Sequence, residues 1–176
     1  HTVTRRQRQM CIRDRLGITM SLQRRLALLK YAHENASWII EDDYDSEFRY
    51  RGRPLPALSA LDKVGRVLYV GTFSKSLFPS IRIGYVVVPE ILMDAFAKMR
   101  NIFGQTSSAI TEEALSNFMD DGAFAEHIRK MRRLYRDRRD ILLNALQENC
   151  SNILIPQQTD AGMHLSLIHI SEPTRL

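Results

Sequence analysis

The chain has 176 residues, 44% of them hydrophobic and 26% charged, with a formal net charge of +5. This is the composition of a soluble globular protein made of one domain or parts of two. No apolar run approaches the roughly eighteen residues that a membrane helix needs. Two cysteines provide neither a disulfide framework nor a metal-ligand spacing. With no secretory signal, we expect a cytoplasmic protein.

The two ends of the chain differ from its middle. Five arginines and one aspartate fall within residues 1–15, so most of the net positive charge belongs to that end. The stretches RQRQMCIRDR and LSLIHISEPTRL resemble translated sequencing-adaptor reads, and neither has the periodicity or caps of a structural element. We therefore expect residues 1–15 and 166–176 to be non-native, and the protein to be a fragment cut at both ends.

A helix followed by a strand is expected at the start of the native part. Ser21 is a suitable N-cap for a helix from Leu22 to about Glu34, in which apolar residues recur at helical spacing as far as Ala32. The apolar run 38–40 ends abruptly at the acids 41–43, which predicts a buried, parallel strand with carboxylates at its carboxyl end. The prolines in RGRPLP, residues 51–56, predict irregular chain.

Two further strands and a helix follow. Residues 67–70 predict a second buried strand that ends in the polar loop 71–76. Residues 83–88 predict a third strand, stopped by Pro89, which suits the first position of another helix. This order predicts an α/β layered domain. In open α/β sheets the ligand lies beyond the carboxyl ends of the strands, where Asp42 and Lys75 both fall.

The last third of the chain reads mainly as helix. The helical pattern begins near Thr106, breaks at residues 121–122 and resumes as a long amphipathic helix from about Ala123. Residues 152–155 and 163–165 are expected to be the first strands of a second, truncated domain.

The acidic segment IIEDDYDSEF allows more than one interpretation. Asp43, Asp45 and Glu47 alternate as in a calcium loop, but such a loop needs a glycine where Phe48 stands. A solvated acidic turn is a second alternative. The acidic segment directly follows a strand rich in tryptophan and isoleucine, which argues against full solvation of Asp42.

The GTFSKS loop invites comparison with a phosphate-binding P-loop. That motif requires glycines where Ser74 and Tyr69 stand, so it is excluded. The loop still offers hydroxyl groups on Thr72, Ser74 and Ser76. Arg82, a few residues further on, could bind a phosphate through two charge-assisted hydrogen bonds.

Taken together, these side chains are the ones that pyridoxal phosphate (PLP) requires of a protein. A lysine such as Lys75 forms a Schiff base with the aldehyde, and a carboxylate such as Asp42 keeps the pyridine nitrogen protonated. Hydroxyl groups and a cation such as Arg82 hold the phosphate.

The stretches WIIEDDYDSEFRY, GRPLPAL, GTFSKSLFPSIRIGY and FMDDGAFAEHIRKMRRLYRDRR resemble fold-type I PLP enzymes of the aspartate aminotransferase type. They are most similar to the aminotransferase-like domain of MocR-type regulators in the GntR superfamily. The resemblance implies that residues 16–105 form part of the large PLP-binding domain. Residues 106–165 would be the connecting helices and the start of the small domain.

The same resemblance implies roles for individual side chains. Asp42 would pair with the pyridine nitrogen, Tyr44 would bond the phenolic oxygen and Lys75 would carry the cofactor. The phosphate would be bound by Arg82, Ser74 and Thr72. An amino acid or amine ligand and a homodimer are also implied, with DNA bound only by an N-terminal winged helix that these residues do not include. A free-standing class I/II aminotransferase is the alternative.

The long helix from Ala123 is also strongly basic. Its arginines and lysine between residues 129 and 139 could bind DNA phosphates or a partner domain. Acidic residues are interspersed and one face is apolar, which favours an ordinary solvated helix face. His127 and His164 have no ligand partners at useful spacing and are expected to be structural.

Overall fold

A computed structural model describes residues 20–43, 45–50, 55–103, 108–157 and 161–169. The chain divides into two compact units. The sheet unit comprises Met20–Asp45 with Arg53–His127, and the hairpin unit takes Ser46–Gly52 with Ile128–Leu176. Within the described ranges, no helix is both long and apolar enough to cross a membrane.

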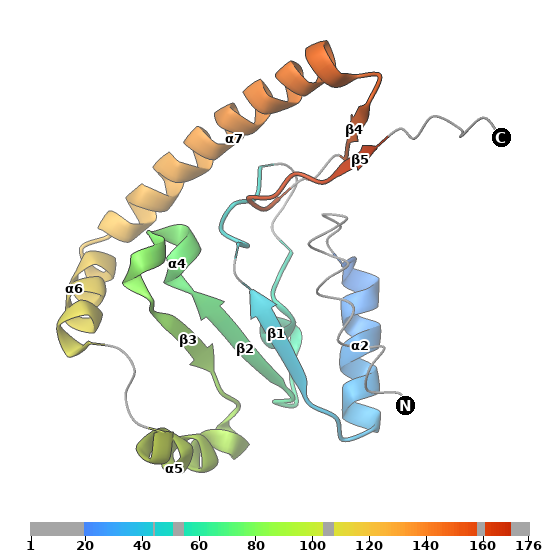
Figure 1. Cartoon of the computed structure of the whole chain (residues 1–176). Coiled ribbons are helices and arrows are strands. Elements are labelled where there is room, and N and C mark those ends of the chain that lie inside the picture. Colours follow the sequence, from blue (N-terminus) through green and yellow to red (C-terminus); the bar gives the residue numbers. More distant parts are fainter. Residues whose placement is uncertain (1–19, 44, 51–54, 104–107, 158–160, 170–176) are drawn as a thin grey trace. The chain divides into compact units, whose positions relative to one another are not determined.

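The sheet unit is built on three strands, β1 (Ile39–Asp43), β2 (Val67–Thr72) and β3 (Gly84–Val87), in the order β1-β2-β3 (Figure 1). β1 and β2 are parallel, as predicted, whereas β3 runs antiparallel to β2. The carboxyl ends of β1 and β2 and the amino end of β3 therefore meet at one edge of the sheet.

The strands are less buried than their apolar sequences predict. Val67 is 4% exposed, but Ile40 is 71% exposed and Val87 57%. The predicted third strand is present as β3, but all four of its residues are exposed. The reason is that β1 and β3 are the outer strands of a three-stranded sheet, which leaves part of their apolar surface uncovered.

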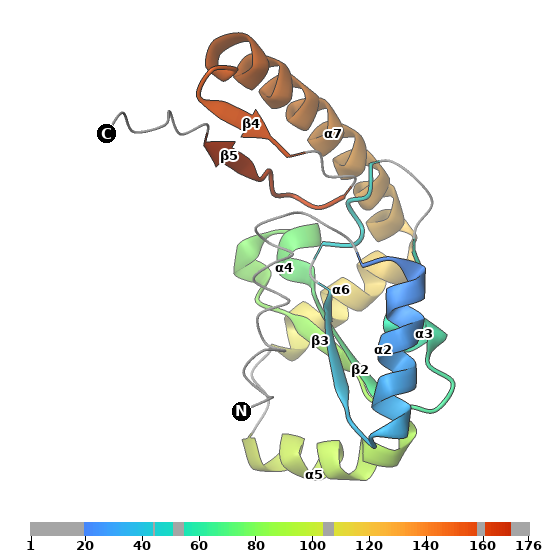
Figure 2. The ribbon, with the colours of Figure 1, turned by 90° about the vertical axis from the view of Figure 1, so that its right-hand side faces the viewer.

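Helices flank this sheet. The predicted first helix is confirmed as α2 (Leu22–Glu34), capped by Ser21, and it lies alongside β1 (Figures 1 and 2). The predicted helix after Pro89 begins with a short 3-10 turn. The remaining helical elements of the unit are α3 (Leu58–Leu61), α4 (Phe73–Ser76), η1 (Pro79–Ile81), η2 (Glu90–Leu92), α5 (Met93–Phe103) and α6 (Ala109–Asp120).

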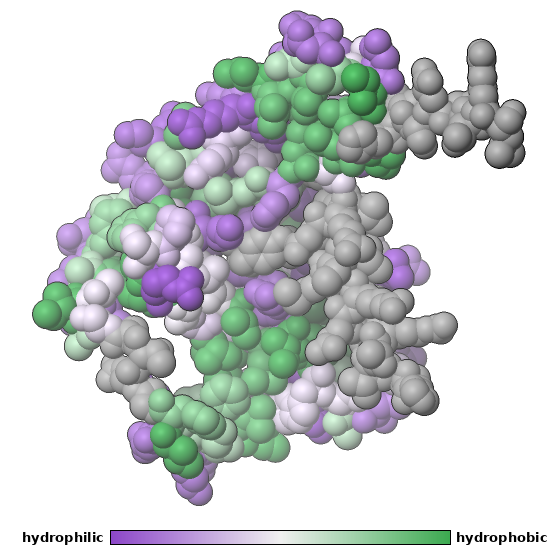
Figure 3. Space-filling view, in the orientation of Figure 1, coloured by the Kyte–Doolittle hydropathy of each residue, from purple (hydrophilic) through white to green (hydrophobic). Residues whose placement is uncertain are grey.

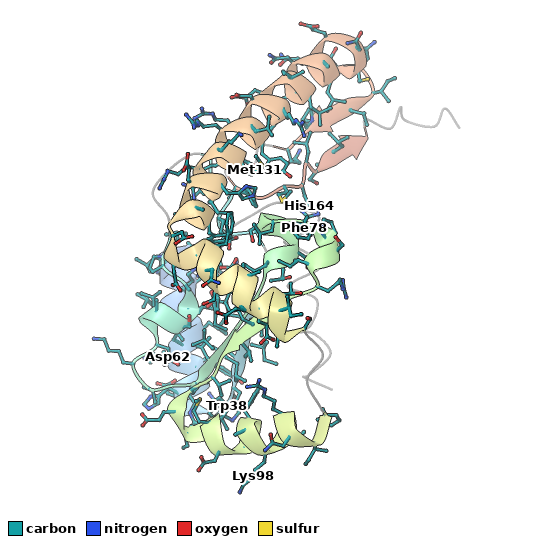
Figure 4. All side chains as sticks on the ribbon, turned by 90° about the vertical axis from the view of Figure 1, so that its left-hand side faces the viewer. Trp38, Asp62, Phe78, Lys98, Met131 and His164 are labelled. Carbon is teal, nitrogen blue, oxygen red and sulfur yellow. The ribbon has the colours of Figure 1, made fainter. Side chains whose placement is uncertain are left out.

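The surface of α5 is unusually apolar. Figure 3 shows hydrophobic side chains gathered around this helix, at the bottom of the view. Ile102 and Phe103 are each 74% exposed, whereas Lys98, labelled in Figure 4, belongs to the polar residues of the same helix. The predicted helix is thus present as α5, but none of its residues is buried against the described parts of the chain.

The long helix α7 (Ala123–Cys150) begins in the sheet unit and continues through the hairpin unit, as its sequence predicts. In the hairpin unit, Phe48 is fully buried and its ring meets that of Tyr135 edge to face, with centroids 5.1 Å apart. Arg132 Nε donates a hydrogen bond to the Glu47 carbonyl at 2.8 Å. The segment around Phe48 is thereby held on α7.

Most of the basic residues of α7 are exposed to solvent, which agrees with the predicted solvated face. Arg139 differs, because its side chain is only 13% exposed and its guanidinium lies over the Tyr50 ring, 5.5 Å from the centroid. The flat guanidinium can stack on an aromatic ring, which allows an arginine at this partly covered position.

A short antiparallel hairpin completes the hairpin unit. It pairs β4 (Leu154–Pro156) with β5 (Leu167–His169). The second strand predicted at residues 163–165 is therefore wrong by a few positions, because Gln157 N bonds the Ser166 carbonyl and brings the following residues beside β4. β5 lies in segment 166–176, whose non-native origin stays a prediction. Residues 1–15 lie outside the described residues.

Candidate functional site

The sheet edge defined above brings together two segments that are far apart in sequence, the end of β1 and the connection between β2 and β3. Asp42 is the last residue but one of β1, and it stands opposite Val70 of β2. β2 passes directly into α4, which carries Lys75. Arg82 lies two residues before β3, whose first residue Gly84 pairs with Thr72. The predicted gathering of carboxylate, amine and guanidinium at one edge is thus consistent with the strand register.

The three consecutive acids of β1 do different things. Successive side chains of a strand point to opposite faces, so Asp42 shares one face with Thr72, while Glu41 and Asp43 share the other. The Glu41 carboxylate accepts hydrogen bonds from the backbone of Leu58 at 2.8 Å and of Ser59 at 3.0 Å. Glu41 is therefore a cap for α3 and has a structural role.

Asp43 is engaged on the same face as Glu41. Its carboxylate accepts a 2.8 Å hydrogen bond from the Tyr69 hydroxyl. Burial raises the pKa of Tyr69 above its ordinary value, and the bond to Asp43 and the negative charge of Asp43 raise that pKa further. Of the three acids, the half-buried Asp42 is the one on the opposite face.

Thr72 organises the turn from β2 into α4. Its hydroxyl oxygen accepts a hydrogen bond from Ser74 N at 3.1 Å, and the hydroxyl donates to the Ile83 carbonyl at 3.3 Å. Its proton is therefore already used. The Ser74 hydroxyl, which is half-buried, makes no hydrogen bond within the described part of the chain.

Lys75 and Arg82 are both exposed. Neither forms an ion pair with any residue that the structure describes. Arg82 has φ 50° and ψ 34°, the left-handed conformation, which costs an L-residue about 1–2 kcal/mol. This conformation turns the chain from η1 into β3, and an arginine at such a position suggests a role beyond packing.

Two further predictions concern the acidic segment, namely the role of Tyr44 and the calcium-loop alternative. Tyr44, predicted to contact the cofactor, lies outside the described residues. The calcium-loop alternative needs the carboxylate of Asp43, which is instead bonded to Tyr69, and Asp45 is 3% exposed. Among the described residues, no three histidine, cysteine or acidic side chains gather as a metal site would require.

Sequence reasoning missed the groups that hold α4 in place. The Phe73 ring lies 5.2 Å from that of Tyr85 and 5.8 Å from that of Phe124, centroid to centroid. His127 Nε2 lies 3.0 Å from the Ser76 carbonyl oxygen. Phe78, labelled in Figure 4, lies two residues beyond α4 and is 53% exposed. The contacts of Phe73 with Phe124 and of Ser76 with His127 each join residues 51 positions apart, and no local pattern indicates them.

Residues 11–168 match the family model for aminotransferases of class I and II. The chain belongs to this aminotransferase family. Its fold is the fold-type I α/β architecture that the motifs predicted. Part of the sheet and the start of a second unit are present in the chain.

Regulators are prominent among the curated relatives of this aminotransferase family member. It is 46% identical over 150 residues to the probable rhizopine catabolism regulatory protein MocR of Rhizobium meliloti, and the alignment covers 85% of this chain and 30% of that protein. It is 38% identical over 152 residues to the HTH-type pyridoxine biosynthesis transcriptional regulator PdxR of Corynebacterium glutamicum, over 86% and 33% respectively. The predicted resemblance to MocR-type regulators is confirmed.

A solved aminotransferase shares the fold. The kynurenine aminotransferase of Pyrococcus horikoshii, in complex with PMP, aligns with a TM-score of 0.75 and 34% identity, covering 83% of the chain and 36% of that protein. The chain spans about a third of the length of the curated relatives described above. That solved aminotransferase holds PMP, the amine form of the PLP cofactor.

Proposed function

We propose that the chain is the PLP-binding, aminotransferase-like effector domain of a MocR-type transcriptional regulator. The observation that carries the proposal is the shared sheet edge: Asp42 comes to it from the end of β1, and Lys75 and Arg82 come to it from the connection between β2 and β3. The Lys75 amine and the Arg82 guanidinium have no ion-pair partners among the described residues. Both groups are therefore available to bind a ligand.

The chemistry of these groups fits PLP. When bound, PLP supplies an electron sink for reactions at the amino-bearing carbon of a ligand. The Asp42 carboxylate would hold the proton on the pyridine nitrogen, and the Lys75 amine would attach the cofactor covalently. Arg82 and Ser74 would bind the phosphate. We assign Thr72 a lesser part there, because its proton is already given to the Ile83 carbonyl. Tyr44 would bond the phenolic oxygen.

An amino acid or amine is the ligand class that follows from this cofactor. In the regulator it would bind through PLP and act as the signal, and the protein would work as a homodimer in the cytoplasm. DNA would be bound by a separate helix-turn-helix domain. The 46% identity to MocR favours the regulator over the alternative, a free-standing aminotransferase. The alternative is supported by the 34% identity to a solved aminotransferase.

A matched pair of variants tests the site. In the intact protein that carries these residues, Asp42→Asn should weaken PLP binding by roughly tenfold to a hundredfold, because a charge-assisted hydrogen bond is lost. Asp43→Asn should leave the affinity within about twofold, because that side chain bonds Tyr69 on the other face. Equal losses in the two variants, or a larger loss for Asp43→Asn, would contradict the assignment.

Turnover distinguishes the two candidate functions. A regulator with bound cofactor should bind an amino compound, shown by a change in the near-visible absorption band, and should shift its operator affinity. A free-standing enzyme should convert an amino donor and a keto acid in many turnovers and should bind no operator DNA.

A further inference from the structure

The helix that carries Lys75 is too short to be stable by itself. α4 has four residues, Phe73–Ser76, and its last turn is closed by one bond from Leu77 N to the Phe73 carbonyl at 2.9 Å. Helix nucleation is unfavourable, so an isolated turn of this length does not persist in water. The position of Lys75 must therefore be fixed by contacts from outside α4.

The amino end of α4 is fixed by β2 and the chain before β3. Thr72 caps the helix at Ser74 N, and Phe73 N donates to the Ile83 carbonyl at 3.0 Å. The Phe73 ring is held between the rings of Tyr85 and Phe124. These contacts hold the two residues before Lys75, but they do not restrain the peptide that follows it.

The carboxyl end of α4 is held by His127 of α7. The Ser76 carbonyl oxygen lies 3.0 Å from His127 Nε2, and Ser76 is 2% exposed. A carbonyl oxygen can only accept, so Nε2 must carry the proton, and it does so whether the ring is neutral or protonated. The His127 ring packs edge-on against Phe118, with centroids 6.4 Å apart, which fixes its orientation.

We infer that His127 is a positioning residue for Lys75. Its Nε2–H holds the carbonyl of Ser76, the residue after Lys75, while the Thr72 hydroxyl holds the amide of Ser74, the residue before it, so that the backbone of α4 is restrained on both sides of the lysine. The inference rests on the proposed function, since it assigns His127 a part in presenting the lysine that would hold PLP. His127 does not contact the cofactor in this assignment.

Two substitutions separate the hydrogen bond from the ring. His127→Phe keeps an aromatic ring against Phe118 but removes the donor. His127→Gln places an amide N–H near the position of Nε2 and should rescue the bond. His33, an exposed histidine of α2, provides the matched control, His33→Phe.

The first measurement needs no cofactor. Amide hydrogen exchange of the intact protein should be about tenfold faster at Leu77 in His127→Phe, the usual effect of losing one buried hydrogen bond, and close to wild type in His127→Gln. Exchange in α2 should not change. If His127→Phe opens the whole unit, His127→Asn, whose amide is too short to reach the carbonyl, takes its place.

The second measurement uses PLP itself. His127→Phe should weaken PLP binding by about tenfold and shift the pH at which the near-visible band of the lysine-bound cofactor changes, whereas His127→Gln and His33→Phe should match wild type. Unchanged exchange and binding in His127→Phe, or equal defects in His127→Phe and His127→Gln, would overturn the inference. If wild type itself never attaches PLP, the proposed function fails, and the exchange experiment still decides whether His127 holds α4.

Discussion

The ring of Tyr85 occupies the space that a side chain on Gly71 would need. A Cβ atom on Gly71 would lie 2.3 Å from Tyr85 Cζ, far inside van der Waals contact. Gly71 is the residue before Thr72 at the end of β2, so this close approach brings Tyr85 against Phe73 and the start of α4. The backbone φ of Gly71 is not positive, so its conformation does not require a glycine. The glycine is required because the Tyr85 ring leaves no room for a side chain.

Gly71→Ala should therefore lower the free energy of unfolding by about 1–3 kcal/mol, the usual cost of overpacking. Urea unfolding followed by circular dichroism measures it. In a Tyr85→Ala background the same change should cost much less, because the ring is gone. An equal cost in both backgrounds would show that Tyr85 is not the cause.

Alkaline pH should reveal the Tyr69–Asp43 bond. The pKa of Tyr69 is raised in the folded protein, so its contribution to stability is complete below the unfolded pKa of about 10 and is lost as pH rises through the folded pKa. Tyr69→Phe should flatten this alkaline loss, measured as the free energy of unfolding between about pH 9 and 11. Parallel curves for the two proteins would contradict the proton linkage.

Glu41 should contribute more to the free energy of unfolding than a solvent-exposed glutamate does. It caps α3 and also receives Arg25 Nη1 at 3.3 Å, with 11% of its side chain exposed. Glu41→Ala should cost roughly 1–3 kcal/mol, because buried N–H groups lose their acceptor. The control is Glu34→Ala, which removes a solvent-exposed pair with Lys30 and should cost well under about 1 kcal/mol.

Arg82 offers a way to separate stability from binding. Arg82→Gly should keep or raise the free energy of unfolding by up to about 1 kcal/mol, because glycine adopts the left-handed conformation freely. The same change should weaken PLP binding, because the phosphate loses its guanidinium. Arg82→Ala should lose affinity without the gain in stability. Retained PLP affinity in both variants would remove Arg82 from the phosphate site.

Local sequence signals were sufficient for much of the fold. The Ser21 cap, the break at Gly122 and the extent of α7 follow from capping, glycine and apolar spacing, and all three are present. The direction of β3 was not predictable, because an apolar run does not indicate whether its strand pairs in parallel or antiparallel. The position of β5 was missed because a three-residue strand carries too little pattern.

Long-range contacts account for what the sequence could not supply at the site. Strand ends predicted the shared edge of Asp42 and Lys75, but the choice between Asp42 and Asp43 rested on family resemblance. Their opposite faces became visible only with the register and with the Tyr69 hydrogen bond, 26 positions away. The link from His127 to Ser76 spans 51 positions and has no local signature.

The central claim is that Lys75 is the residue that attaches PLP. The most direct test is to load the intact protein with PLP, reduce it with borohydride and locate the phosphopyridoxyl group by peptide mass spectrometry. We predict the label on Lys75, and its absence in Lys75→Arg. A label on Lys30, Lys63, Lys98 or Lys130 instead, or unchanged labelling of Lys75→Arg, would contradict the claim.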